Sequence, residues 1–175
     1  SRSKSVIGER IMIYSSIGYY ALILGLSISL PIFFFSIKNF GRNEIFDSKI
    51  ISFSFIQFLL VVVSFLSLII SFVFSDFSNE TVFNNSHTTK PLFYKISGTW
   101  GNHEGSLLLW LLVLNLFIFI FLVKSRNLPK KYRILTVLFQ QIIIIGFFIF
   151  LIDSSNPFNY VFPTPNEGLG LNPIL

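Results

Sequence analysis

The segment from Trp100 to Ser106 has the residue types best suited to chemistry, and it reads Trp-Gly-Asn-His-Glu-Gly-Ser. An imidazole beside a carboxylate can bind a metal or haem iron or carry a proton, so His103 and Glu104 are candidates for those tasks. A zinc or haem site needs more ligands or an open pocket, however. We therefore favour a structural role, with Ser106 as the N-cap of a helix and Glu104 near its positive end.

Other chemistry is sparse in this sequence. The chain has no cysteine, which excludes disulfides, thiolate metal sites and Cys-x-x-Cys redox chemistry. It has no nucleophile triad, phosphate-binding loop or dinucleotide-binding motif. The second histidine, His87, lies in a polar stretch and is expected to be solvated. The basic residues fall between apolar runs, so they indicate membrane topology rather than nucleic-acid binding.

Membrane-spanning helices are the elements that must position His103 and Glu104. The sequence is 53% hydrophobic and 12% charged, and its mean hydropathy is +0.72. About 20 helical residues cross the hydrocarbon core, and only a helix satisfies its own backbone there. Four runs without Asp, Glu, Lys or Arg are long enough, and they cover residues 11–37, 50–75, 105–123 and 134–152. We predict an all-α polytopic membrane protein with four transmembrane helices.

Basic residues in the connecting segments predict the orientation of this domain, residues 11–152. The segments between the first and second runs and between the third and fourth runs carry eight Lys and Arg, against five on the opposite side. The positive-inside rule then places both termini on the outer side, in the intermembrane space or periplasm. The N-terminal tail 1–10, the loop 76–104 and the C-terminal tail 153–175 would share that side, so the loop and the C-terminal tail can form one surface.

Large amide side chains are the main polar groups within the spans. They are Gln57, Asn115, Gln140 and Gln141, and we expect them to form hydrogen bonds between helices. The runs contain no ionisable side chain that would form a proton path, which argues against a pump, transporter or channel.

Several short motifs follow one another in a fixed order along the chain. The longest is Thr99–Trp110, and four further elements accompany it, namely Phe93–Ile96, Ser155–Phe158, Glu167–Gly168 and Leu171–Leu175. In order and spacing these motifs resemble the CcmF family, the cytochrome c haem lyases of system I biogenesis, and Thr99–Trp110 is similar to the signature of that family. The resemblance covers nearly the whole chain and implies the N-terminal part of a CcmF-type lyase, in a mitochondrial-like split or truncated form.

The resemblance implies work on haem together with partner proteins. Such lyases take haem from CcmE and attach its vinyl groups to the thiols of apocytochrome c. The Trp-rich WWD segment and haem-ligand histidines of the family are not matched here, so haem is expected to be bound mainly by a partner chain, and no metal site is assigned. The implied partners are the remaining CcmF part, CcmH-like and CcmE-like proteins, apocytochrome c and membrane lipid, without nucleic acid.

We therefore expect this chain to provide a membrane scaffold and an outer-face platform, and not to be catalytic alone. No catalytic residue is assigned. The candidate haem and apocytochrome platform comprises Trp100, Gly101, His103, Glu104, Gly105, Trp110, Asn156, Pro157, Phe158, Asn172 and Pro173. The alternative is a non-catalytic accessory subunit of a mitochondrial respiratory complex, derived from a lyase fragment.

Residue usage bears on the compartment. The chain has 23 Phe and 25 Ile but a single Ala, although helix propensity favours Ala. This bias fits AT-rich codons and hence an organellar genome. We expect a multi-pass protein of the mitochondrial inner membrane, with a bacterial inner membrane as the less favoured alternative.

Overall fold

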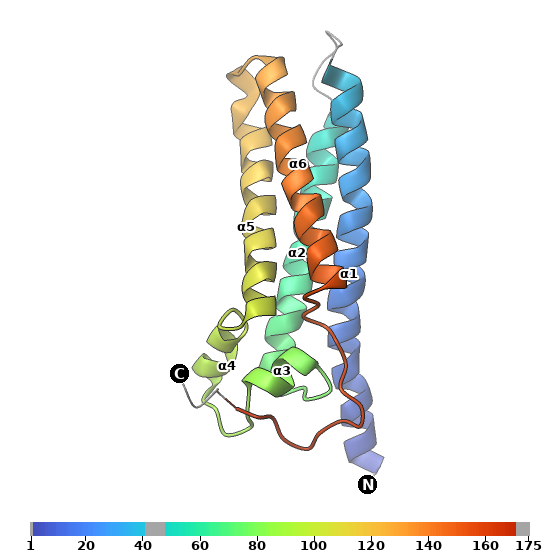
Figure 1. The fold of residues 1–175 in the computed structure, drawn as a ribbon, viewed down its shortest axis with the longest axis vertical. Helices are drawn as coiled ribbons and strands as arrows, with labels where there is room; N and C mark the ends of the chain where they lie inside the picture. The colour runs from blue at the N-terminus through green and yellow to red at the C-terminus, as the bar shows by residue number, and fades with distance from the viewer. Residues whose placement is uncertain (1, 41–47, 171–175) are drawn as a thin grey trace.

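The computed structural model describes residues 2–40 and 48–170, with side chains from residue 13 onward within those ranges. Four long helices form an up-and-down bundle: α1 (Arg2–Phe40), α2 (Ser48–Val73), α5 (His103–Lys124) and α6 (Lys130–Asp153) (Figure 1). Two short helices, α3 (Glu80–Asn85) and α4 (Leu92–Gly98), lie at one end of it, and the 3-10 turn η1 (Ser125–Asn127) joins α5 to α6. The described residues form no β-strand, only an isolated bridge between Asn79 and Tyr160.

The four long helices confirm the predicted all-α fold with four membrane-crossing helices. Each contains a segment long and apolar enough to cross a bilayer. These segments are Ile13–Phe40, Ser48–Val73, His103–Asn127 and Lys130–Asp153. In the most apolar 18-residue stretch of each segment, fewer than half of the residues are buried within the structure. This exposure suits helices that face lipid or other helices.

Helices extend beyond the charge-free runs at several points. The expected N-terminal tail 1–10 is helical from Arg2 onward and forms the start of α1. The expected loop 76–104 contains α3 and α4 as well as the first turn of α5. Polar residues are tolerated in a first helical turn because its free N–H groups donate hydrogen bonds to polar side chains or water. A run without charged residues therefore predicts the membrane core better than it predicts the helix ends.

Close contacts between α1 and its neighbours organise the bundle core. Gly25 of α1 lies against the ring of Phe148 on α6, where an added Cβ would stand 2.7 Å from Cζ. Small residues allow such close approach between helices in membranes. Further fully buried side chains complete the core, among them Leu22, Val61, Leu108, Leu111 and Ile144.

Amide side chains connect three helices at the centre of the bundle. Gln57 of α2 donates a hydrogen bond to the Ser29 hydroxyl of α1 at 2.5 Å, and Gln141 of α6 donates to the side-chain oxygen of Gln57 at 3.2 Å. Asn115 instead donates to the carbonyl of Leu111 in its own helix, at 2.8 Å. The expected interhelical role therefore holds for Gln57 and Gln141 and not for Asn115.

Candidate functional site

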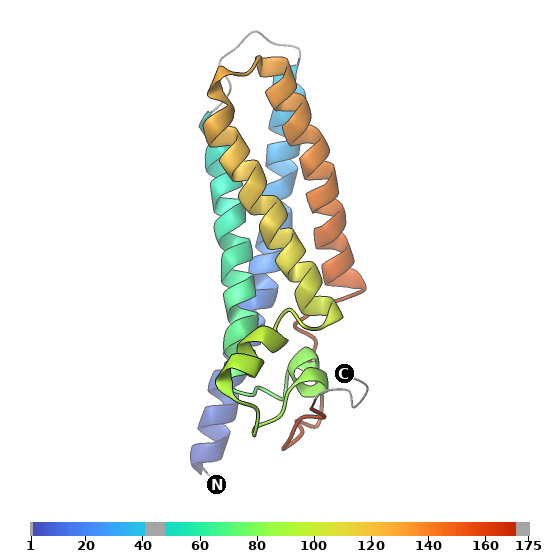
Figure 2. The same ribbon diagram turned by 90° about the vertical axis from the view of Figure 1, so that its left-hand side faces the viewer.

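A compact cap covers one end of the bundle and contains most of the candidate residues. It comprises residues 74–105, which include the first turn of α5, and residues 154–170, and Figures 1 and 2 show it at the end where α1 begins. Backbone hydrogen bonds join its two parts: the Glu80 N–H donates to the Asn159 carbonyl at 2.8 Å, and the Leu169 N–H donates to the Phe83 carbonyl at 2.8 Å. The loop after α2 and the segment after α6 thus form one structure.

Asn79 connects three parts of the chain at the base of the cap. It is fully buried, and its side-chain oxygen accepts from the Val82 N–H at 3.1 Å, which caps α3. Its Nδ2 donates to the Pro157 carbonyl at 2.9 Å and to the Ser15 hydroxyl at 3.1 Å. An asparagine before Glu-Thr-Val is a helix-start signal, so this cap could have been predicted from the sequence.

A buried carboxylate lies beside Asn79. Asp76 is 4% exposed and accepts hydrogen bonds from the Ser78 N–H at 3.2 Å and the Ser78 hydroxyl at 2.5 Å. The Ser15 hydroxyl of α1 donates to its other oxygen at 3.4 Å. Burial raises the pKa of Asp76, and the hydrogen bonds from Ser78 and Ser15 offset part of that rise.

Asn102 sets the first turn of α5, so the prediction that Ser106 is the N-cap is wrong. The Asn102 side-chain oxygen accepts from the Gly105 N–H at 2.7 Å, and its Nδ2 donates to the Gly98 carbonyl at 2.8 Å. Ser106 lies inside the helix and donates to the His103 carbonyl at 2.9 Å. Gly105 is buried directly against the Thr99 backbone, where an added Cβ would collide with the carbonyl oxygen of Thr99.

His103 connects this turn to the segment that follows α6. Its Nδ1 lies 3.0 Å from the Ser155 hydroxyl. Next along that segment, the Asn156 side chain accepts from the Phe158 N–H at 2.9 Å. The ring of Phe158 is 2% exposed and occupies the space beside Gly18 of α1, where a Cβ would collide with it. Pro157 is buried as well, so this segment is anchored in the bundle.

Two cavities open beside this junction. One of about 200 Å³ is polar, and its lining includes Glu104, Ser155 and Asn156. The other, of about 320 Å³, lies between α1 and the segment after α6, and its lining includes Tyr19, Tyr20 and Tyr160. These tyrosines were not identified from the sequence, because the pairing of α1 with residues 156–160 is a long-range contact.

The remaining candidate residues are spread more widely. Trp100 is 42% exposed on the cap, next to the exposed Gly101. Trp110 is 60% exposed but lies seven residues into α5, roughly 10 Å along the helix from His103. Trp110 is therefore not part of the cap surface. Asn172 and Pro173 lie outside the described residues.

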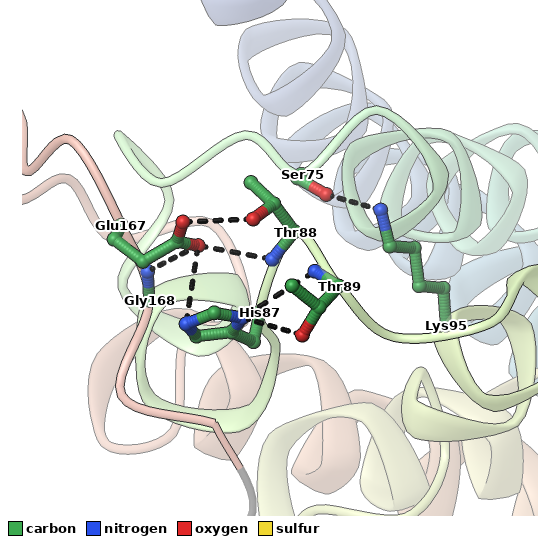
Figure 3. A network of polar contacts seen from close by, with 7 residues as sticks. All are labelled: Ser75, His87, Thr88, Thr89, Lys95, Glu167 and Gly168. Carbon is green, nitrogen blue, oxygen red and sulfur yellow. Dashed lines mark hydrogen bonds and ion pairs between the residues drawn. The ribbon is translucent and has the colours of Figure 1, made fainter.

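Glu167, near the end of the segment 154–170 that follows α6, binds to the loop after α3 (Figure 3). Its carboxylate accepts from the Thr88 N–H at 2.9 Å and from the Thr88 hydroxyl at 2.7 Å. These two hydrogen bonds, led by the one from the backbone, lower the pKa of Glu167. His87 is held nearby, 2.9 Å from the Thr89 hydroxyl and 3.7 Å from Glu167, so it is not simply solvated as expected.

The described side chains do not fit a haem or metal held by this chain alone. Among residues 2–40 and 48–170, no three His, Cys, Asp or Glu side chains are grouped as metal ligands. Both nitrogens of His87 face cap side chains, and Nδ1 of His103 faces Ser155. Neither histidine lines one of the two cavities beside the junction.

Comparison with known proteins gives consistent matches. The chain is 40% identical over 163 residues to the cytochrome c-type biogenesis protein CycK of Rhizobium meliloti, covering 91% of this chain and 24% of CycK. It is 34% identical over 160 residues to the cytochrome c-type biogenesis protein CcmF of Escherichia coli, covering 90% of this chain and 24% of that CcmF. No family model matches.

A solved structure shares the fold. The cytochrome c heme lyase CcmF superposes with a TM-score of 0.72 at 23% sequence identity, over 83% of this chain and 25% of that chain. This chain therefore spans about a quarter of the length of the relatives it matches. From these relatives and the shared fold, the chain belongs to the CcmF family of cytochrome c biogenesis proteins and corresponds to a CcmF-type N-terminal part.

Proposed function

We propose that this chain is a structural subunit of a CcmF-type haem lyase that attaches haem covalently to apocytochrome c. Its bundle provides the scaffold against which haem-holding helices from the rest of the lyase pack. Its cap forms part of the platform that receives haem and apocytochrome. The WWD segment and the haem-ligand histidines belong to that remaining part.

The observation that carries this proposal is the junction of the two motif segments in the cap. His103, from the Trp-Gly-Asn-His-Glu-Gly-Ser element, lies 3.0 Å from Ser155, from the Ser-Asn-Pro-Phe element. Asn79 fixes the second element through the Pro157 carbonyl, and Phe158 anchors it against α1. A surface that many separate contacts hold in one shape suits a role in positioning partners, since binding then costs little ordering of the chain.

The chemistry assigned to this chain is limited to positioning. Because the described residues offer no site that fits haem, we derive no reaction step on haem from them. The Glu104 carboxylate and the Asn156 amide line the same polar cavity, about 200 Å³ in volume. They offer hydrogen-bond acceptors and donors to a polar group of an incoming partner.

The proposed location is the mitochondrial inner membrane, with the cap facing the intermembrane space. Figure 1 shows the first residues of α1 and the segment after α6 at the same end of the bundle. The opposite end has the turn between α5 and α6, where Lys124, Arg126, Lys130 and Lys131 are concentrated. The positive-inside rule places that turn in the matrix. The proposed partners are the remaining CcmF part, CcmH-like and CcmE-like proteins, and apocytochrome c.

Affinity purification of the tagged chain from mild-detergent membranes tests the proposal. We expect recovery of cytochrome c biogenesis chains, among them one with a WWD segment and paired histidines, together with a haem absorption spectrum. Stable recovery with an oxidase or dehydrogenase, without biogenesis chains, would instead establish the accessory-subunit alternative.

A further inference from the structure

The first turn of α4 exposes three large side chains in a row. Leu92 is 58% exposed, Phe93 76% and Tyr94 59%, and none of the described side chains of α4 is buried. Consecutive residues of a helix point about 100° apart, so this turn projects from the chain on more than one side. Large apolar side chains gathered in this way indicate a contact with lipid or with another protein.

Contacts with α2 set the depth of α4 relative to the bundle. Gly98 of α4 lies against the ring of Phe72, where an added Cβ would stand 3.4 Å from Cε1. The Lys95 ammonium donates a hydrogen bond to the Ser75 hydroxyl at 2.6 Å (Figure 3). Phe72 and Ser75 lie where the charge-free run 50–75 ends. Helix α4 therefore lies beside the last turn of α2, as Figures 1 and 2 show from two sides.

This end of α2 reaches the headgroup layer of a bilayer. The helix has 26 residues, which corresponds to a length of about 39 Å. The hydrocarbon core is only about 30 Å thick, and the two headgroup layers bring the total to roughly 40–45 Å. Lys49 lies at the start of α2, near the opposite boundary, so the surplus length falls at the end that contacts α4. Helix α4 is therefore level with the headgroups.

The composition around α4 matches that layer. Residues 81–103 include no Asp or Glu but contain Lys90 and Lys95, which suits the phosphate groups of phospholipids. Aromatic side chains such as those of Phe93 and Tyr94 are favoured at the boundary between hydrocarbon and water. The exposed apolar surface of α2 extends to the same level, since Phe74 is 59% exposed. Depth, charge and side-chain type thus favour lipid as the contact of this turn.

We propose that α4 lies in the headgroup layer on the cap side of the membrane, with Leu92, Phe93 and Tyr94 in contact with phospholipid. The apolar side chains reach toward the acyl chains, and the lysines remain among the headgroups. Trp100 follows α4 by two residues, so this contact holds the Trp-Gly-Asn-His-Glu-Gly-Ser segment at a fixed height above the bilayer. The lipid contact depends on the four membrane spans and not on the proposed function.

Photo-crosslinking of the full chain in its native membrane tests the proposal directly. The probe is p-benzoylphenylalanine in place of Phe93, and the matched control is the same probe in place of Phe162, which is 75% exposed. The Val161 N–H next to it donates to the Ser78 carbonyl, and in both views the segment after α6 extends farther from the long helices than α4 does.

We expect the probe at position 93 to form phospholipid adducts at several times the yield of the probe at position 162. Three outcomes would overturn the proposal: no phospholipid adduct at position 93, an adduct there mainly with another protein chain, or equal phospholipid yields at the two positions.

Substitution of Phe93 gives a second test in the same membranes. Phe93→Asn should speed tryptic cleavage after Lys95 by about tenfold, because this turn loses the lipid contact of one large apolar side chain. Asparagine and phenylalanine have similar helix propensities, so a faster cleavage reports the lost contact rather than a weakened helix. Phe93→Trp should keep the wild-type rate, and Phe162→Asn is the matched control. Cleavage of Phe93→Asn at the wild-type rate would refute the lipid contact.

These outcomes are separate from those that test the proposed function. If biogenesis chains are recovered with this chain but position 93 does not reach phospholipid, the lyase function stands and the lipid contact is refuted. If position 93 reaches phospholipid but no biogenesis chain is recovered, the lipid contact stands and the lyase function is refuted.

Discussion

At the level of single residues, contacts in the cap leave little room for substitution. Asn102 caps α5 while its Nδ2 donates to the Gly98 carbonyl, and Gly105 allows the Thr99 carbonyl to lie directly against the helix. The sequence showed that this segment is unusual. It did not show that Asn102 is the cap, because a helix-start pattern allows several polar residues as N-cap.

Gly105→Ala should destabilise the protein by about 1–3 kcal/mol, the usual cost of an overpacked site. The added Cβ would collide with a backbone carbonyl, which cannot rotate away as a side chain can. The measurement is the thermal unfolding midpoint in detergent. Gly101→Ala is the matched control, because its nearest contact would be an ordinary 3.4 Å. An equal effect of the two substitutions would contradict the described turn.

Asp76→Asn should stabilise the cap near neutral pH. Burial raises the folded-state pKa of Asp76 above its ordinary value of 3.8, so the contribution of this group to stability is complete below pH 3.8. That contribution is lost as pH rises through the folded-state pKa. The gain in unfolding temperature from Asp76→Asn over the wild type should therefore grow as pH rises from about 4 to 8.

The control for this prediction is Asp153→Asn, at an exposed carboxylate at the end of α6. We expect no comparable pH-dependent gain from it. A gain from Asp76→Asn that shrinks as pH rises would show that Asp76 is stabilised, not strained, in its ionised form.

At the level of elements, the four spans followed from the sequence but the cap did not. Runs of about 20 residues without charge predict membrane helices because the hydrocarbon thickness sets their length. The cap depends on backbone hydrogen bonds such as that from the Val161 N–H to the Ser78 carbonyl, 2.9 Å long. Such contacts join residues far apart in the chain and leave no periodic pattern. The alternation of four spans predicts that the two segments lie on one side, and the structure adds the residues through which they touch.

Glu167→Ala should loosen the segment after Phe158 from the loop after α3. It removes the acceptor for both the N–H and the hydroxyl of Thr88 (Figure 3). Limited proteolysis should then cleave residues 159–170 faster than in the wild type, while the bundle remains intact. The control is Glu80→Ala, since the Glu80 backbone N–H, which this change keeps, donates to the Asn159 carbonyl.

The wild-type segment should show a related pH dependence. The hydrogen bonds from Thr88 lower the folded-state pKa of Glu167 below 4.5, so its contribution to docking is present above pH 4.5 and is lost as pH falls through the folded-state pKa. In the Glu167→Ala variant, the cleavage rate of residues 159–170 should not show this pH dependence. Faster cleavage of the wild type at higher pH, absent in Glu167→Ala, would contradict this assignment.

At the level of the whole molecule, the chain is a four-helix membrane bundle with the cap at one end. The surface of its membrane-crossing helices is largely apolar and exposed. The cap unites the segments that resemble the family signature, whereas Trp110 lies along the bundle and not on the cap. In the proposed function, the helix faces pack against the rest of the lyase and the cap positions partners.

The central claim is that the cap takes part in haem attachment, and the yield of holo-cytochrome c tests it most directly. The yield should be measured with His103→Ala and with Trp100→Ala, each normalised to the amount of this chain in the membrane. His87→Ala is the matched control, a second histidine at the same end of the molecule. The account predicts a clear fall in yield for the first two at normal chain levels and none for the control. Normal cytochrome c maturation in both His103→Ala and Trp100→Ala would contradict it.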